Sequence, residues 1–265
     1  MGAYMDLLQT IILGLIQGVT EWLPISSTGH LRLIEHLWNL KVPILFDGLL
    51  HVGTLIVTLL FFHKDIRNIL SALAKHDFKT ENGKFIPLII VGTLPTALIG
   101  VLFGNAIEAF FRDLFPIAGA FAVCGVALYL SRSGNESKDK ISYLEALAIG
   151  IAQGVAIIPG VSRSGLTIAV ALLLGIKREK AFKFSFLLSI PAIIGALGLT
   201  LYSQHEAMVV AGVDWTEILV GMAVSMVVGY FALRLLKKIV AHKKFYLFAM
   251  YCWLLSIVLA VLGLT

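Results

Sequence analysis

QGVTEWLPISSTGH, at residues 17–30, interrupts an apolar segment with a proline, a carboxylate, a histidine and several hydroxyl side chains. That segment covers residues 7–31, and a second one at residues 146–176 is interrupted by PGVSRSG at residues 159–165. A helix needs about 20 residues to cross the hydrocarbon core, so each segment is long for one crossing and too short for two. Helical hairpins that enter and leave on the same side fit both lengths, provided that protein or a wet cavity surrounds the break.

The composition indicates a membrane protein. Of the 265 residues 58% are hydrophobic and 14% charged, whereas soluble domains carry about 25% charged residues. A water-soluble enzyme, a disordered chain and a coiled coil are therefore excluded. Apolar runs predict membrane-spanning helices at residues 44–62, 85–104, 114–131, 184–202, 218–233 and 245–265. The fold class predicted is an all-α polytopic membrane protein with about six transmembrane helices and two re-entrant hairpins, at residues 7–38 and 143–176.

The distribution of basic residues supports the re-entrant interpretation. If both broken segments return to the side they enter from, 17 of the 21 Lys and Arg residues share one side, in loops 64–84, 132–140, 177–183 and 234–244. The other side holds Arg32, Lys41 and Arg112. The positive-inside rule then places the basic loops in the cytoplasm and both termini outside a cell membrane. The net charge of +5 reflects this bias, so we expect no nucleic-acid partner.

The two broken segments resemble each other at a constant offset of 136 positions. Six identities fall within 16 ungapped positions and pair Gly14, Gln17, Gly18, Val19, Ser26 and Gly29 with Gly150, Gln153, Gly154, Val155, Ser162 and Gly165. Three spans separate the copies, so the second copy starts from the opposite face. We therefore expect one membrane domain, 1–265, built as an inverted repeat of residues 1–131 and 141–265. In such folds broken helices meet near the midplane, where the substrate binds.

The broken tips carry groups suited to an anion. A proline followed by Ser or Thr before a new apolar run is a helix-start signal, and a helix N-terminus attracts anions through its free N–H groups and its dipole. Arg163 is the only Lys or Arg between residues 141 and 176, and its planar guanidinium matches a phosphate. Further donors come from the hydroxyl groups of Ser26, Ser27, Thr28, Ser162 and Ser164.

Glu21 and His30 add groups that binding alone does not need. A carboxylate in an apolar run indicates proton transfer or metal binding, and histidine titrates near neutrality. Together with Arg163 they suggest phosphoryl transfer. We expect Ser27 as the nucleophile with His30 as its base, while Ser26 and direct attack by water stay open as alternatives.

Asp47 and His51 lie one turn apart on a predicted span. They fit either a second layer of residues around the site or an interfacial hydrogen-bonded pair, and the sequence does not choose between these.

The two tip motifs resemble the signatures of the undecaprenyl-diphosphatase (bacitracin-resistance) family, and the similarity continues through FDGLLHVGTL at residues 46–55 and FKFSFLLSIPAIIGA at residues 182–196. The resemblance implies a membrane phosphatase that converts a polyprenyl diphosphate to the monophosphate and recycles the lipid carrier for cell-envelope glycan synthesis. It implies a catalytic core of Glu21, Ser27, His30 and Arg163. The residues expected to support phosphate binding are Ser26, Thr28, Ser162, Ser164 and Gly165.

The resemblance also implies a divalent cation, Mg²⁺ or Ca²⁺. Gln17 stands where the family has Glu or Gln, so two carboxylates four residues apart are not available. Glu21, with Gln17 nearby, would bind the cation together with phosphate oxygens and water. The expected partners are the lipid substrate and the bilayer, and a homodimer is left open. The alternative function is a transporter or lipid carrier that uses the same anion site, because inverted repeats with broken helices are a transporter design.

Overall fold

The computed structural model describes residues 6–203 and 215–264, apart from residues 41 and 43. Helices α3 (Ile44–Phe61), α5 (Phe85–Phe110), α6 (Leu114–Leu130), α9 (Arg178–Ser203), α11 (Trp215–Ala241) and α12 (Phe248–Leu262) cover the six predicted spans. Two single 3₁₀ turns lie at Ser131–Ser133 and Phe245–Leu247. The part of the chain that the structure describes contains no β-strand, so the predicted all-α fold is confirmed.

Among the described residues, five of these helices are long and apolar enough to cross a membrane, or six if α3 and the bent helix after it count as one span. Three spans, those of α5, α9 and α11, extend past their predicted ends. For α9 and α11 the prediction stopped at the first charged residue, Lys183 before one span and Glu217 and Arg234 around the other. Charged residues at helix ends, such as Arg178 and Lys238, lie beyond the apolar part of their helices. Residues 64–84, expected as a loop, contain helix α4 (His63–Ala74), which bends by 76° from α3.

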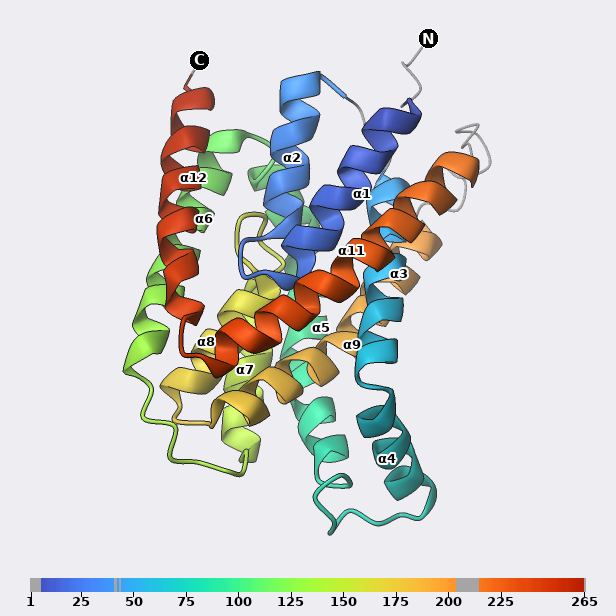
Figure 1. Ribbon diagram of the computed structural model, residues 1–265, viewed down its shortest axis with the longest axis vertical. Coiled ribbons are helices and arrows are strands. Elements are labelled where there is room, and N and C mark those ends of the chain that lie inside the picture. Colours follow the sequence, from blue (N-terminus) through green and yellow to red (C-terminus); the bar gives the residue numbers. More distant parts are fainter. Residues whose placement is uncertain (1–5, 41, 43, 204–214, 265) are drawn as a thin grey trace.

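Both re-entrant hairpins are present. Helices α1 (Leu7–Trp22) and α2 (Ser27–Trp38) pack together at one end of the molecule, and α7 (Tyr143–Val155) and α8 (Arg163–Leu173) pack together from the other end (Figure 1). The first arms start alike, because Asp6 and Ser142 each form a capping box. The second arms also start alike, with Ser26 and Ser162 as N-caps. Both pairs of caps are 136 positions apart, so the repeat seen in the sequence extends to the helix starts.

Each hairpin packs against a span from the other half of the chain. Helix α1 lies along α11, and α7 lies along α5. Glycines allow this approach: a Cβ atom at Gly14 would lie 2.7 Å from the carbonyl oxygen of Gly221, and one at Gly150 would lie 2.1 Å from that of Gly92. Any larger residue would push these helices apart. The two halves are therefore interleaved.

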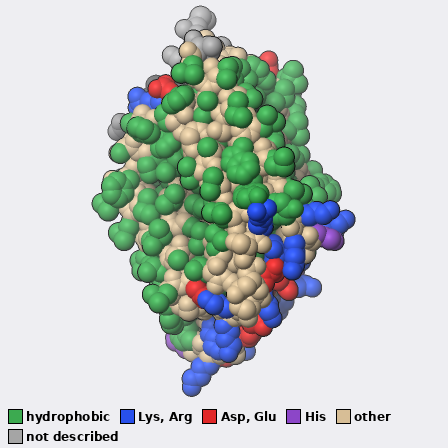
Figure 2. All heavy atoms as spheres, turned by 90° about the vertical axis from the view of Figure 1, so that its left-hand side faces the viewer, with side chains coloured by type: hydrophobic (Ala, Val, Ile, Leu, Met, Phe, Trp, Pro, Cys, Tyr) green, Lys and Arg blue, Asp and Glu red, His purple; other side chains and the backbone are tan. Residues whose placement is uncertain are grey.

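The four basic loops share one face. Ion pairs join them to one another. Lys180 pairs with Glu81 at 3.1 Å, Lys183 with Asp65, and Arg178 with Glu136 at 2.8 Å. Lys243 of the fourth loop also pairs with Glu136, at 3.6 Å. The space-filling view shows most of the visible Lys and Arg side chains gathered at this end, below a wide hydrophobic surface (Figure 2). The predicted grouping of these loops is confirmed. Lys41, expected at the other end, lies outside the described residues.

Candidate active site

The tips of the two hairpins meet in the middle of the molecule. The backbone N–H of Gly160 donates to Ser26 Oγ at 3.0 Å, and Ser164 Oγ donates to the carbonyl oxygen of Trp22 at 3.0 Å. These contacts join residues more than 130 positions apart in the chain. The expectation that the broken helices converge is therefore confirmed.

Ser26 is used for structure. It has a φ of +64°, in the left-handed region, and its side chain is buried. Its Oγ accepts the N–H of Gly29 at 3.4 Å as well as that of Gly160. With both lone pairs engaged, this oxygen ties the two tips together and is not free to attack a substrate.

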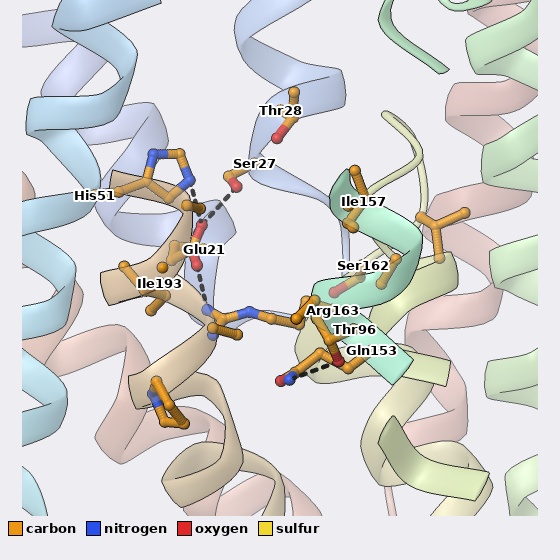
Figure 3. A pocket seen from close by; sticks show the side chains of 18 of the residues that line it. Glu21, Ser27, Thr28, His51, Thr96, Gln153, Ile157, Ser162, Arg163 and Ile193 are labelled. Atoms are coloured by element: carbon orange, nitrogen blue, oxygen red, sulfur yellow. Dashed lines mark hydrogen bonds and ion pairs between the residues drawn. The ribbon is translucent and has the colours of Figure 1, made fainter. Parts of the chain in front are cut away.

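Glu21 is the centre of charge. It lies in the last turn of α1 and is buried. Its Oε1 forms an ion pair with Nη2 of Arg163, the first residue of α8 (Figure 3). Its Oε2 accepts Ser27 Oγ at 2.6 Å and Gln17 Nε2 at 3.2 Å. The predicted grouping of Glu21, Ser27 and Arg163 is thus present, with Ser27 bonded to Glu21.

His51 completes this group. Its Nδ1 lies 2.8 Å from the backbone carbonyl of Asp47 and its Nε2 lies 3.4 Å from Glu21 Oε2. A carbonyl can only accept, so Nδ1 carries a proton. Nε2 then donates to the carboxylate only when the ring is an imidazolium. The sequence left the role of His51 open between two alternatives, and the structure places it beside Glu21.

His30 lies elsewhere, contrary to the prediction that it acts as the base for Ser27. Its Nδ1 lies 2.7 Å from the carbonyl oxygen of Ser26, and its Nε2 lies 2.7 Å from the hydroxyl of Tyr251. Its ring also stacks on that of Tyr251, with centroids 5.7 Å apart. Sequence proximity suggested the pairing with Ser27, but the helical turn points His30 toward α12. We therefore interpret His30 as a positioning residue that holds the turn at Ser26.

Replacing His30 with phenylalanine is expected to lower both thermal stability and kcat. The loss of two hydrogen bonds costs about 2 kcal/mol, and displacement of the turn lowers turnover by about 10- to 100-fold. Tyr251→Phe breaks the same clamp from its far end and should cause a smaller loss in the same direction. Unfolding temperature and kcat across pH check this. An unaffected Tyr251 variant with a changed pH profile in the His30 variant would restore His30 as the base.

The predicted phosphate-binding residues divide into two groups. Ser26, Thr28 and Ser162 line the cavity beside Glu21, although the Oγ of Ser26 is engaged by two backbone N–H groups. Ser164 and Gly165 are not among its lining residues: Ser164 bonds to Trp22, and the N–H of Gly165 donates to Ser162 Oγ at 3.1 Å. These two residues support the tip from behind.

The cavity has a volume of about 450 Å³ and two unlike ends. The polar end carries Glu21, Ser27, His51 and Arg163, whereas the other end is lined by apolar residues of α5, α9 and the tip after α7. Its lining starts at Thr93 on α5 and at Pro191 on α9, roughly 12 and 20 Å along helices that begin at the basic face. The rings of Phe182, Phe186 and Trp22 pack between the site and that face. The cavity therefore lies around the middle of these helices, away from the basic loops at their ends.

Sequence reasoning missed the wall opposite Glu21. Thr96 and Gln153 line it, and Gln153 Nε2 donates to Thr96 Oγ1 at 3.2 Å (Figure 3). The available signal was that Gln153 is the repeat partner of Gln17. Its meaning depended on which helix faces it, and the sequence does not state that.

The residues at the site fit a cation shared with a substrate. Among the described residues no three His, Cys, Asp or Glu side chains cluster in a way that could hold a metal ion. Glu21 offers one carboxylate at the cavity, and the amide oxygen of Gln17 behind it is buried without a partner but does not line the cavity. Magnesium is commonly held by one or two carboxylates with substrate phosphates and water, which this donor set matches.

The model of the family described as bacitracin resistance protein BacA matches residues 10–258. The chain belongs to this family. It is similar to the undecaprenyl-diphosphatase of Carboxydothermus hydrogenoformans, with 43% identity over 97% of this chain and 98% of the relative. It is also similar to the undecaprenyl-diphosphatases of Methanosphaera stadtmanae, at 38% identity over 98% and 99% of the two chains, and Thermosipho africanus, at 41% over 96% and 99%. The family predicted from the tip motifs is confirmed.

Proposed function

We propose that the protein is a multi-pass membrane hydrolase that converts undecaprenyl diphosphate to the monophosphate and phosphate. This reaction recycles the lipid carrier for cell-envelope glycan synthesis and provides resistance to bacitracin. The main support for this function is the ion pair of Glu21 with Arg163, together with the hydrogen bond from Ser27 to Glu21. These residues lie at the polar end of a cavity whose other end is apolar. Such a cavity suits a molecule with a charged head and a hydrocarbon tail.

The diphosphate binds between the N-termini of α2 and α8. Their free N–H groups and the guanidinium of Arg163 neutralise phosphate charge. Most of the catalysis of phosphoryl transfer comes from such positioning and charge neutralisation. Arg163 exchanges part of its contact with Glu21 for contact with the phosphate.

Ser27 is the proposed nucleophile and Glu21, rather than His30, its base. Ser27 Oγ attacks the terminal phosphorus while its proton passes to Glu21 Oε2, 2.6 Å away. The anhydride bond breaks and the lipid monophosphate leaves. Water then attacks the phosphoserine and releases phosphate. Rapid quenching followed by mass spectrometry should find phosphate on Ser27, whereas direct attack by water would leave this residue unmodified.

The apolar end of the cavity takes the first part of the prenyl chain. Gly195 on α9 lines it, and no atom lies within 4 Å of where its Cβ would be. This glycine is therefore not required for helix packing and leaves the apolar end of the cavity wide. Its neighbours Val101 and Leu199 are exposed on the apolar surface, so the tail passes from the cavity into lipid.

Phosphate release by the purified protein in detergent tests the function. We expect rapid hydrolysis of undecaprenyl diphosphate and slow hydrolysis of inorganic pyrophosphate, which lacks the tail. Arg163→Ala serves as the inactive control. Equal rates with both substrates would remove the role of the apolar end, and solute uptake by proteoliposomes without hydrolysis would favour a carrier.

A divalent cation, Mg²⁺ or Ca²⁺, is proposed to bind with the diphosphate at Glu21 and Gln17. When bound, it would supply positive charge to the phosphate oxygens. Chelation by EDTA is expected to lower activity by at least tenfold and added Mg²⁺ to restore it. Substrate titration with and without the chelator separates effects on KM from effects on kcat. Full activity after exhaustive chelation would show that Arg163 and His51 supply enough charge.

The basic face is proposed to lie in the cytoplasm, with both termini and the cavity toward the outside. Cysteines introduced by Ala241→Cys and Asp113→Cys, both exposed positions, should react with a membrane-impermeant maleimide from opposite sides of oriented vesicles. The position near α6 should label from outside. Labelling of both from one side would contradict this topology.

Residues 1–265 are proposed to form one membrane domain, because each hairpin packs on a span from the other half. A homodimer stays a prediction, which the mass of the protein–detergent complex measured by light scattering would test.

A further inference from the structure

Gln153 has a buried polar atom that the reaction scheme leaves unused. The residue lies on α7, is 2% exposed and lines the cavity. Its amide nitrogen donates to Thr96 Oγ1 at 3.2 Å and to the carbonyl oxygen of Leu188 at 3.4 Å. Its amide oxygen is buried without a partner. Such an atom costs about 1–3 kcal/mol, so it points to a function.

The neighbouring hydrogen bonds fix the orientation of this amide. Thr96 donates its hydroxyl proton to the carbonyl oxygen of Gly150 at 3.0 Å, so its oxygen is an acceptor toward Gln153. The carbonyl oxygen of Leu188 can also only accept. Both neighbours therefore require the NH₂ group of Gln153, and the carbonyl oxygen of the amide is left over.

The matching free donor belongs to Arg163, which lines the same cavity. Arg163 Nη1 is buried and has no partner, whereas Nη2 is paired with Glu21. Both residues line this cavity, and in Figure 3 the guanidinium of Arg163 lies between Glu21, with which it is paired, and the amide of Gln153. An unsatisfied donor and an unsatisfied acceptor in one cavity can satisfy each other, directly or through one water.

We propose that Gln153 is a positioning residue for Arg163: its amide oxygen holds the Nη1 side of the guanidinium when the diphosphate occupies the site. This proposal rests on the proposed diphosphate site. In the free site, Glu21 orients the guanidinium from one side. When phosphate competes with Glu21 for Nη2, the amide oxygen of Gln153 holds Nη1 and so fixes the plane of the guanidinium. A guanidinium held in one plane loses less freedom on binding a phosphate through two parallel hydrogen bonds.

A double-mutant cycle tests the proposal through binding. The ligand is farnesyl methylenediphosphonate, in which CH₂ replaces the bridging oxygen so that it binds without being cleaved. Its dissociation constant is measured by calorimetry for the wild type, Gln153→Met, Arg163→Lys and the double variant. We expect Gln153→Met to weaken binding about tenfold alone and less than about twofold when Arg163 is already lysine, because coupled residues are not additive.

A matched control separates positioning from packing. Ser225→Ala removes one buried hydrogen bond between helices, Ser225 Oγ to the carbonyl oxygen of Leu50 at 3.2 Å, outside the cavity. Ser225→Ala should lower the unfolding temperature about as much as Gln153→Met does. Its effect on the dissociation constant should be the same in the wild type and in the Arg163→Lys variant. The proposal would be overturned if Ser225→Ala were coupled to Arg163→Lys as strongly as Gln153→Met is. It would also be overturned if the effects of Gln153→Met and Arg163→Lys on the dissociation constant were additive. Failure of the wild type to bind the ligand would overturn the diphosphate site itself.

Discussion

Replacing Arg163 with alanine is expected to lower kcat/KM for undecaprenyl diphosphate by about 10³-fold or more. Arginines that stabilise a transferring phosphoryl group contribute about 10³–10⁵ in rate. Here the guanidinium is the only Lys or Arg side chain among the described residues that line the cavity. Both KM and kcat should suffer, because the same group binds the diphosphate and stabilises the transition state. Steady-state kinetics of phosphate release measure both constants.

Two further variants make this result specific. Arg163→Lys keeps the charge but loses the planar fork, so an intermediate loss is expected. Arg112→Ala removes an exposed arginine outside the cavity and should leave the kinetics unchanged. Unfolding temperatures must accompany the rates, because Arg163→Ala also removes a partner of buried Glu21. A loss explained entirely by unfolding, or a small loss in folded protein, would contradict the assignment.

Replacing Glu21 with glutamine should have an effect of similar size but a different form. The amide keeps the shape of the side chain yet cannot take the proton of Ser27, so kcat is expected to fall by about 10³-fold. Arg163 also loses the carboxylate that competes with phosphate for it. At a saturating concentration of Mg²⁺, which offsets the weaker cation site, KM should therefore stay unchanged or fall. The contrast with Arg163→Ala lies in the separate values of kcat and KM.

The alternative outcome for Glu21→Gln is equally clear. A rise in KM with kcat preserved would place Glu21 in binding of substrate or cation alone. Ser162→Ala is a useful comparison, because Ser162 lines the same cavity but has no contact with Glu21. It should raise KM modestly and leave kcat close to that of the wild type.

Much of the fold could be predicted from the sequence, because a lipid bilayer requires apolar helices of a certain length and allows a broken helix only inside the protein. Apolar length identified the six spans, and breaks at Pro24 and Pro159 identified the hairpins. Helix ends were less predictable, since charged residues such as Arg178 continue a helix beyond the hydrocarbon core. Helix α4 was missed because it is too polar to cross the membrane.

The site was predictable only where one motif contains its members. Glu21 and Ser27 are six positions apart, and the repeat brought Arg163 to them. His30 is only three positions from Ser27, but its place on α2 turns it toward Tyr251. His51 and Gln153 reach the cavity from α3 and α7, so their roles depend on helix packing. Spacing along the chain does not encode that packing.

The interleaving of the two halves also determines when this protein becomes an enzyme during its synthesis. The α1 arm, which carries Glu21, lies against α11, and α11 ends at Ala241. A ribosome that has made the first arm, and even Arg163, has therefore not yet made the surface on which that arm rests. The growing chain must keep a carboxylate-bearing half-helix in the insertion machinery or at the lipid surface until the last quarter of the polypeptide arrives. Catalytic competence is thus acquired near the end of translation.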